Sequence, residues 1–136
     1  MAHDPHDIRL TTDAARHPDA FATAFNSGDP DMLESVYEPE APLITREGLA
    51  LRGAARRDTN ARLQALGVPI QVTVRQVHEY ADELALLIVD WIIRGESPAT
   101  GALVDVTGTA TDVIRRGPDG LWRYVIDNPF GVAAGL

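Results

Sequence analysis

The apolar pattern of the chain changes its period at about residue 70, and this change limits the possible folds more than any other feature. Beyond that point apolar residues alternate with polar ones or form short runs, in four segments rich in Val, Ile, Thr and aromatic residues: 70–79, 84–94, 103–116 and 121–128. Such segments are typical of β-strands. The links between them are short enough for neighbours that run antiparallel. The pattern therefore predicts a sheet of four consecutive antiparallel strands.

The part of the chain before residue 70 has helical spacing instead. A first helix is expected to begin at Pro18 and to stop at Asn26-Ser27-Gly28, and Asp29-Pro30-Asp31 has the composition of a second helix start. A third helix is expected over residues 53–66, before Gly67. Between the second and third helices, Leu43-Ile44-Thr45 follows two prolines and fits an edge strand.

Helices first and strands last predict an α+β domain, with three N-terminal helices packed on one face of a curved, mostly antiparallel sheet. A pocket is expected between the two layers. We expect residues 12–136 to form one domain and residues 1–11 to be a flexible tail, in which His3 and His6 have no role.

Composition excludes several classes of function. The net charge is −8, and the twelve basic residues are all arginine and are scattered, which argues against binding of nucleic acid. The chain has no cysteine, no apolar run of membrane-spanning length, no recognisable metal-ligand spacing and no glycine-rich phosphate loop. We therefore expect a cytoplasmic protein without metal or cofactor that does not bind membranes.

Three aspartates lie within or beside strands in which a plain core would have apolar residues. Burial of a charge costs several kcal/mol unless the charge is paired or neutralised, so such acids need a partner or a functional cavity. Asp112 shares its strand side with Ala110 and Ile114, and Asp90 shares its side with Leu86, Ile88 and Ile92. Asp127 precedes Asn128-Pro129, where it fits the capping of a turn, and it is also a candidate for the lining of the pocket.

Other side chains are candidates for the pocket. Gln76 and His78 point the same way as Ile70, Val72 and Val74 if no bulge interrupts their strand. The aromatic residues at core spacing are interpreted as packing or pocket lining: Phe21, Phe25, Tyr37 and Trp91. Arg56 and Arg57 are interpreted as a solvated helix face, although either could bind an anionic substrate.

Several segments together resemble the SnoaL-like branch of the nuclear transport factor 2 (NTF2) superfamily. They are the Phe-Asn-Ser-Gly-Asp turn at 25–29, residues 33–41, Gly53 at a helix start, and 111–116 with the Asp-Gly-Leu-Trp hairpin at 119–122. The resemblance covers most of the chain after about residue 12. It implies a cone-shaped α+β barrel, commonly a homodimer, with one deep apolar pocket for an apolar or carbonyl-bearing small molecule.

The resemblance also suggests roles for individual residues. Asp112 matches the aspartic acid with which ketosteroid isomerases donate a hydrogen bond to the developing oxyanion. Their general base is matched by Thr45, with Glu47 two residues on, and residues 18–28 contain no counterpart of their catalytic tyrosine.

Three hypotheses follow. The first is an acid/base enzyme of isomerase or cyclase type, including polyketide cyclases, that uses Asp112, Asp90 and His78 to abstract a proton next to a carbonyl. The second is a non-catalytic module for ligand binding or dimerisation. The third is an epoxide hydrolase, which requires Asp90 and Asp112 in one hydrogen-bond network with a guanidinium. Asp90 and Asp112 decide between these hypotheses, since both enzyme hypotheses require the two carboxylates in one cavity.

Overall fold

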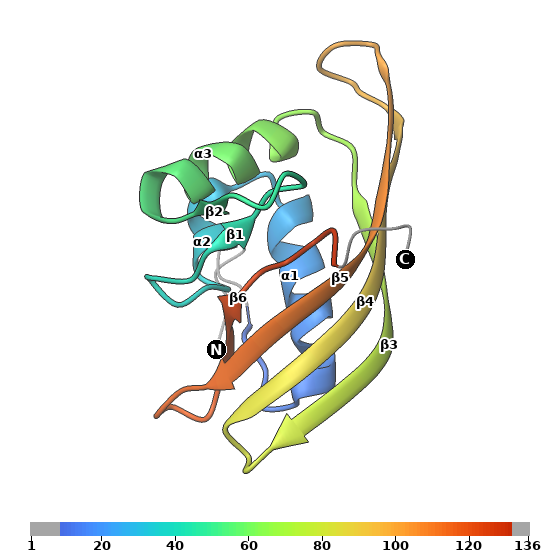
Figure 1. Cartoon of the computed structure of the whole chain (residues 1–136). Helices are drawn as coiled ribbons and strands as arrows, with labels where there is room; N and C mark the ends of the chain where they lie inside the picture. Colours follow the sequence, from blue (N-terminus) through green and yellow to red (C-terminus); the bar gives the residue numbers. More distant parts are fainter. Residues whose placement is uncertain (1–8, 132–136) are drawn as a thin grey trace, which may run out of the picture.

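The computed structural model describes residues 9–131, and its largest element is a four-stranded antiparallel sheet (Figure 1). The strands are β3 (Ile70–Tyr80), β4 (Leu84–Glu96), β5 (Leu103–Arg116) and β6 (Trp122–Ile126), and they lie in chain order. Each pairs with the next through a short turn or hairpin loop. The four strands and their antiparallel order agree with the sequence prediction.

The N-terminal part forms helices and a small second sheet. A 3₁₀ turn (Ala14–Arg16) leads into α1 (His17–Asn26), and α2 (Pro30–Glu34) and α3 (Gly53–Gln64) follow. The strands β1 (Leu43–Ile44) and β2 (Ala50–Leu51) pair with each other in a separate two-stranded sheet, and Leu43 also forms an isolated parallel bridge with Asp127, just after β6. The helix α2 begins where predicted, because the Asp29 carboxylate accepts a hydrogen bond from Asp31 N at 2.9 Å. It ends before Tyr37, which forms an isolated bridge with Tyr124.

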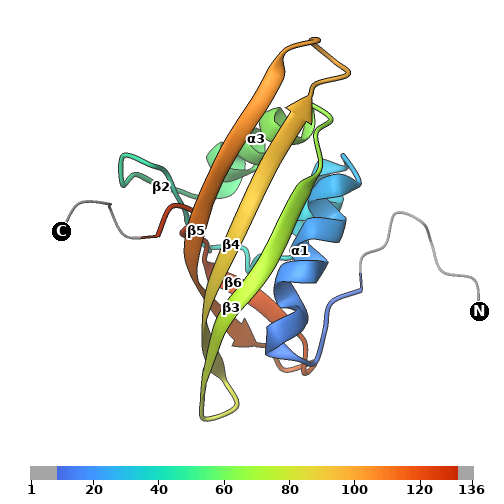
Figure 2. The same ribbon diagram turned by 90° about the vertical axis from the view of Figure 1, so that its right-hand side faces the viewer.

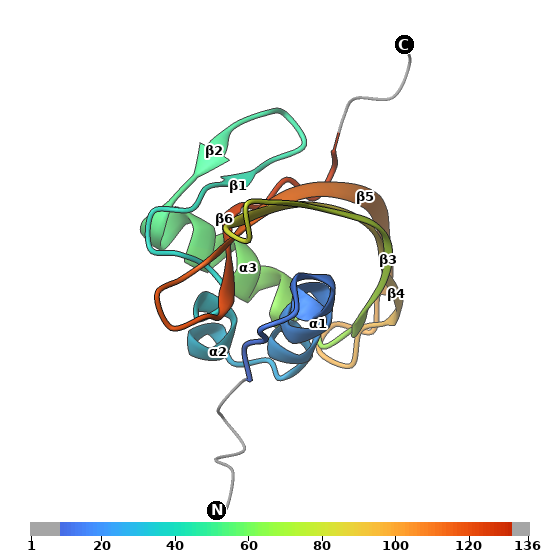
Figure 3. The same ribbon diagram turned by 90° about the horizontal axis from the view of Figure 1, so that it is seen from below.

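The main sheet curves around α1, as the view along the molecule shows (Figure 3). In the view of the sheet itself, β3, β4 and β5 lie side by side with α1 beside β3 (Figure 2). Irregular pairing at Val74/Gln76 and at Val113/Ile114 marks two bulges, which bend and twist a sheet. The sheet is not closed into a barrel, and the fold is an open, cone-like α+β arrangement.

The core lies between the concave face of the sheet and the helices. Alternate residues of β4 are buried there, namely Ala85, Leu87, Val89, Trp91 and Ile93. The side chain of Asn26, at the end of α1, joins helix to sheet by donating to Ile70 O at 3.1 Å and accepting from Ile70 N at 2.8 Å. The helices therefore hold a fixed position against β3.

The N-terminal end of the described chain is tied to the last strand. Trp122 N donates to Thr11 O at 3.0 Å, and the Trp122 ring nitrogen donates to Thr12 O at 3.2 Å. Most of the predicted flexible tail, with His3 and His6, lies outside the described residues. In the described part of the chain, no helix is long and apolar enough to cross a membrane.

The fully buried side chains of helix α3 are polar, although the half-buried Leu63 also packs against the core. Its buried residues are Arg56, Asn60 and Gln64, at a spacing of four. Gln64 Nε2 donates to Ala24 O and Phe25 O, both at 3.3 Å, and so satisfies carbonyl groups at the end of α1. The prediction that Arg56 lies on a solvated helix face is wrong, because its side chain is 3% exposed.

Candidate functional site

A cavity of about 310 Å³ lies between the concave sheet face, α1, α3 and the β1–β2 hairpin. Its lining is mostly apolar and includes Phe21, Phe25, Leu43, Leu63, Ile70, Val72, Val89, Trp91, Ile93, Val106, Ala110 and Phe130. Phe21, Phe25 and Trp91 were expected to be packing or pocket lining, and the structure places them in this wall. A cavity of this size and character fits an apolar small molecule.

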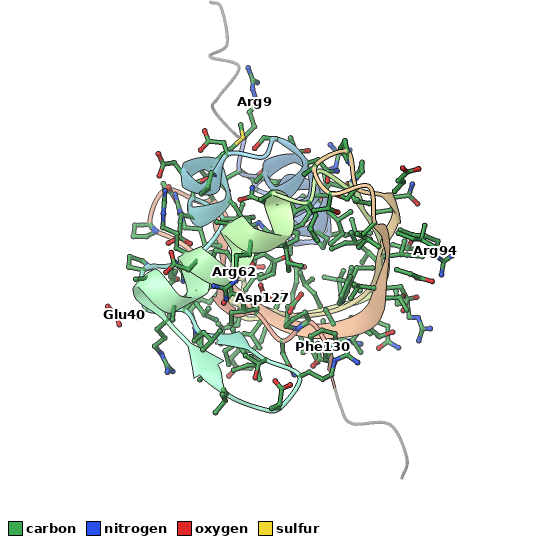
Figure 4. All side chains as sticks on the ribbon, turned by 90° about the horizontal axis from the view of Figure 1, so that it is seen from above. Arg9, Glu40, Arg62, Arg94, Asp127 and Phe130 are labelled. Carbon is green, nitrogen blue, oxygen red and sulfur yellow. The ribbon has the colours of Figure 1, made fainter. Side chains whose placement is uncertain are left out.

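Two carboxyl groups interrupt the apolar wall. Asp112 and Asp127 both line the cavity, and they are only 4% and 6% exposed. Asp112 points inward from β5, between Ala110 and Ile114, as its position in the strand predicts. Figure 4 shows Asp127 in the interior of the molecule.

Asp127 is held in place by the chain around it. Just after β6, its backbone N–H donates to Pro42 O at 3.0 Å, and its carbonyl accepts from Ile44 N at 2.8 Å. These bonds join the end of β6 to β1 and direct the carboxylate into the core. The interpretation of Asp127 as a turn cap is wrong, since its carboxylate bonds to Tyr37 and not to the turn that follows.

The two carboxyl groups belong to one hydrogen-bond network. They are hydrogen-bonded to each other. Tyr37 Oη donates to Asp127 Oδ2 at 2.5 Å, and Asn60 Nδ2 donates to Tyr37 Oη at 3.0 Å. On the other side, Asn128 N donates to Asp112 Oδ1 at 2.8 Å. Because the Tyr37 oxygen accepts from Asn60, the phenol proton is directed to Asp127.

Burial raises the pKa values of the two acids to different extents. Burial, together with the negative charge of Asp127, raises the pKa of Asp112 well above its ordinary value. Burial also raises the pKa of Asp127 to about 6, against the hydrogen bonds from Tyr37 and Asp112 and the charge of Arg56. At neutral pH, Asp112 therefore carries the shared proton and Asp127 is the carboxylate.

Two more groups, Tyr124 and His17, border this network. Burial raises the pKa of Tyr37 and of Tyr124, so both phenols stay protonated. His17 packs against Tyr124 with ring centroids 4.4 Å apart. Burial lowers the pKa of His17 to about 4, so this ring is neutral at neutral pH and adds no charge beside the acids.

Asp90 does not take part in the site. Its neighbours on the same strand side, Leu86, Ile88 and Ile92, face away from the cavity, so the expectation that Asp90 lies in the apolar wall is wrong. Its carboxylate bonds to Arg75 Nε and to Thr109 Oγ1, both at 2.7 Å. These hydrogen bonds, that from Thr109 first, lower the pKa of Asp90. Asp90 and Asp112 therefore lie on opposite faces of the sheet. This refutes the isomerase or cyclase hypothesis in the form that uses Asp90 with Asp112, and it also removes the network that the epoxide hydrolase hypothesis requires.

Gln76 and His78 also lie outside the cavity. The bulge between Val74 and Gln76 shifts the alternation by one residue, so that Val77 points inward and its two neighbours point outward. His78 Nε2 and Gln76 Oε1 are 2.8 Å apart on the exposed face. The prediction that both face the core is wrong because the bulge reverses their side of the sheet.

Asn60 is a site residue that sequence reasoning missed. It lines the cavity and bonds to Tyr37 from the polar stripe of α3. The signal for it was the spacing of Arg56, Asn60 and Gln64 on a helix that has no comparable apolar stripe. Thr45 and Glu47, the counterparts of the isomerase base, also line the cavity. Within residues 9–131, no three acidic or histidine side chains are grouped as a metal site.

Comparisons with known proteins give structural matches only. No family model and no curated protein matches the chain. A nuclear transport factor 2 (NTF2-like) superfamily protein from Salmonella enterica serovar Typhimurium matches with a TM-score of 0.68 and 17% identity, over 90% of this chain and 91% of that one. A ketosteroid isomerase-like protein from Erwinia carotovora atroseptica matches with a TM-score of 0.65 and 18% identity, over 82% and 87%.

A third solved structure covers nearly the whole chain. It is a proposed calcium/calmodulin dependent protein kinase II association domain from Xanthomonas campestris, with a TM-score of 0.72 and 17% identity. The match spans 98% of this chain and 100% of that one. At these identities the three structures establish the fold and leave the activity to the site itself.

Proposed function

Because the chain has the NTF2-like fold, in which the residues of the cavity decide the chemistry, we propose that it is an acid/base enzyme of isomerase or cyclase type. It moves a proton at a carbon next to a carbonyl group of an apolar small molecule, without a cofactor. One observation supports this most strongly: two buried, hydrogen-bonded carboxyl groups, Asp112 and Asp127, in the wall of an apolar cavity. A pair of acids whose pKa values are separated by their surroundings can supply both a base and an acid.

In this mechanism Asp127 is the general base. Its carboxylate removes a proton from the carbon beside the carbonyl, and the electron pair of the broken C–H bond moves onto the carbonyl oxygen to give an enolate. The proton then returns to another carbon, which isomerises the substrate. Alternatively, the enolate carbon attacks the carbon of a second carbonyl, which closes a ring, and the alkoxide formed from that carbonyl takes up the proton. A pKa of about 6 suits a base that acts near neutrality.

Asp112 is the proton donor. Its O–H, which bonds to Asp127 in the free protein, turns to the carbonyl oxygen of the substrate and stabilises the enolate as its charge develops. The same movement withdraws a hydrogen bond from Asp127. Since that hydrogen bond lowers the pKa of Asp127, its loss makes Asp127 a stronger base at the moment when it accepts a proton.

Tyr37 and Asn60 are positioning residues. Asn60 directs the Tyr37 proton to Asp127, and this bond fixes one oxygen of the carboxylate. The second oxygen is left for Asp112 and, in the proposed reaction, for the substrate carbon. Both acids are buried in the apolar wall of the cavity, where the lower effective dielectric constant strengthens their electrostatic effects.

The proposal is tested by deuterium exchange at the α-carbon of 2-tetralone, an apolar bicyclic ketone, followed by NMR in buffered D₂O. We expect the protein to accelerate exchange above the buffer rate, and Asp112→Leu to reduce the acceleration about 100-fold, a typical cost of removing one donor to an oxyanion. Leucine fills the space of the carboxyl group with an apolar side chain and leaves one polar group, Asn128 N, without its acceptor. Circular dichroism would establish that the variant is folded.

Asp90→Asn is the matched control, because it removes the charge of an acid on the opposite face of the sheet. We expect its exchange rate to equal that of the unmodified protein. The proposal fails if the protein does not accelerate exchange, or if Asp112→Leu and Asp90→Asn give the same rate. Binding of the ketone without exchange would favour the non-catalytic ligand-binding module.

We also propose that the chain forms a homodimer through the outer face of the sheet. This face has an apolar row on β4 in which Leu86 is 39% exposed and Ile88 and Ile92 are half-buried. Rows of this kind on a sheet face are typical of interfaces, and the match to a proposed association domain adds support. The ion pairs Arg75–Asp90 and Arg94–Asp105 lie on the same face, so these four charges are paired there.

Light scattering is expected to give twice the chain mass of 14.7 kDa. Ile88→Glu is expected to give a monomer, because it places a charge in the apolar row. Leu49→Glu, at a more exposed apolar position on the β1–β2 hairpin, serves as the control and should leave the mass unchanged. A monomer at high micromolar concentration of unmodified protein would refute the dimer.

A further inference from the structure

The β1–β2 hairpin carries an arginine to the mouth of the cavity. Arg46 follows Thr45 in the turn of this hairpin, and its side chain lines the cavity and is exposed to solvent. The turn is fixed by three hydrogen bonds: Thr45 N to Leu49 O at 2.8 Å, Gly48 N to Thr45 O at 2.9 Å, and Leu49 N to Thr45 Oγ1 at 3.0 Å. The arginine therefore projects from a structured turn.

The Arg46 guanidinium stacks on the aromatic ring of Phe130. It lies 4.3 Å from the ring centroid of Phe130. Figure 4 shows Phe130 near the C-terminal end of the described chain. Phe130 packs edge-on against Trp91, with centroids 5.6 Å apart, and Trp91 Nε1 donates to Pro129 O at 2.6 Å. Gly108 allows this approach, because a Cβ there would lie 2.9 Å from Pro129 O.

No carboxylate in residues 9–131 pairs with Arg46. Seven other arginines form ion pairs in this part of the chain, whereas Arg46 makes only the ring contact with Phe130. Glu47, the next residue, also lines the mouth but forms no ion pair with Arg46. A guanidinium that stacks by one face on an aromatic ring keeps its N–H donors at the edge, where they fit a carboxylate.

The charge of the whole protein makes this arrangement informative. With a net charge of −8, the protein repels anions in general, and a local cation is needed for an anionic group to approach the cavity. Arg46 supplies that cation at the mouth, while the two acids are enclosed in the apolar wall. The cavity thus has a cationic end, an apolar body and an acid/base end.

We propose that Arg46 binds a carboxylate on the ligand, so that the substrate is an apolar oxo-acid. Its carboxylate pairs with the Arg46 guanidinium at the mouth, and its hydrocarbon part fills the cavity. Its carbonyl group reaches Asp112 and Asp127, and this part of the inference rests on the proposed function. Arg46 then determines both the specificity for acids and the orientation of the carbonyl.

The test compares two probes of nearly equal shape, 2-naphthylacetate and 2-naphthylacetamide, which differ in the charge of one end. Their dissociation constants are measured by isothermal titration calorimetry at pH 7.5 and low ionic strength. We expect the unmodified protein to bind the acid about threefold to tenfold more tightly than the amide, as befits an ion pair at an exposed site. In Arg46→Gln the two probes should bind equally, with the affinity for the amide unchanged.

Arg116→Gln is the control. It removes the same charge from an exposed arginine that also has no ion pair within residues 9–131, but that lies outside the cavity lining. This variant should keep the preference for the acid. The inference is overturned if neither probe binds, if the unmodified protein shows no preference, if the preference survives in Arg46→Gln, or if it disappears in Arg116→Gln.

Failure of the Arg46 inference can be distinguished from failure of the proposed function. A preference for the acid that depends on Arg46, together with no exchange of 2-tetralone, would establish the anion site and refute the catalytic role of the two acids. The reverse result, exchange that depends on Asp112 without any preference for the acid, would refute Arg46 as a specificity residue.

Discussion

Asp127→Asn is expected to lower the rate of ketone α-proton exchange about 1,000-fold, the largest effect of any single change in the cavity. The amide has nearly the same shape as the carboxylate and can still accept the hydrogen bond from Tyr37, but it cannot take up a proton. General bases contribute about 100-fold to 10,000-fold to such reactions. The measurement is the initial rate of deuterium incorporation by NMR at pH 7.5.

The pH dependence gives this prediction a second readout. Asp127 must be ionised to act, so the rate of the unmodified protein should rise with pH and level off above about 6, where burial places the pKa of this acid. Asp112 must be protonated, and its pKa is raised well above the ordinary value, so the rate should fall again at higher pH. In Asp127→Asn the rise near pH 6 should be absent.

Stability should change in the opposite direction to activity. A carboxyl group with a raised pKa in the folded state holds its proton more tightly than in the unfolded state, where its pKa is about 4. Stability from this group is therefore present below pH 4 and is lost as the pH rises through about 6. Asp127→Asn removes that loss, so the free energy of unfolding should depend less on pH between 4 and 6. An exchange rate or a pH profile like that of the unmodified protein would exclude Asp127 as the base.

Arg56→Ala is expected to destabilise the fold by about 3–5 kcal/mol, the range measured when one partner of a buried ion pair is removed. The Arg56 guanidinium bonds to both carboxylate oxygens of Glu34 and, through Nη1, to Glu38 O at 3.1 Å and Ala41 O at 2.8 Å. It also stacks on the ring of Tyr37, at 4.3 Å from the centroid. Truncation leaves Glu34 and two carbonyl groups without this partner. Urea denaturation at pH 7 measures the loss.

Arg57→Ala is the matched control on the adjacent residue. The side chain of Arg57 is 41% exposed and pairs with Asp31, which is 83% exposed, at 2.7 Å. Exposed pairs of this kind contribute about 0–1 kcal/mol. Equal losses in the two variants would show that Arg56 contributes no more than a surface ion pair. Because the charge of Arg56 lowers the pKa of Asp127, Arg56→Ala should also move the pH dependence of exchange to higher pH.

The order of the elements follows from local patterns. The change of period near residue 70, the short links and the helix starts at Pro18 and Asp29 predict the sheet and helices, because each depends on residues close together in the chain. The inward direction of Asp112 follows in the same way from its neighbours Ala110 and Ile114. Alternation alone is sufficient when a strand is regular.

The composition of the site depends on contacts that local patterns do not encode. The strand pattern predicts Asp90 and Asp112 in the same cavity, because both have apolar neighbours on their strand side. In the structure, however, Leu86, Ile88 and Ile92 lie on the outer face of the sheet and not in the cavity wall. The bulge after Val74 reversed the direction predicted for His78. An apolar row identifies a covered face without indicating which layer covers it.

Local sequence patterns are sufficient to predict the α+β class, the antiparallel order of the last four strands and the inward position of Asp112, since these arise from periodicity and turn chemistry. The meeting of Asp127, Tyr37 and Asn60 with Asp112 in one network depends instead on tertiary packing. These residues come from the end of β6, the segment after α2 and the middle of α3. Tyr37 and Asp127 are 90 residues apart in the chain, so only the packing of α3 and β1 against the curved sheet brings them together.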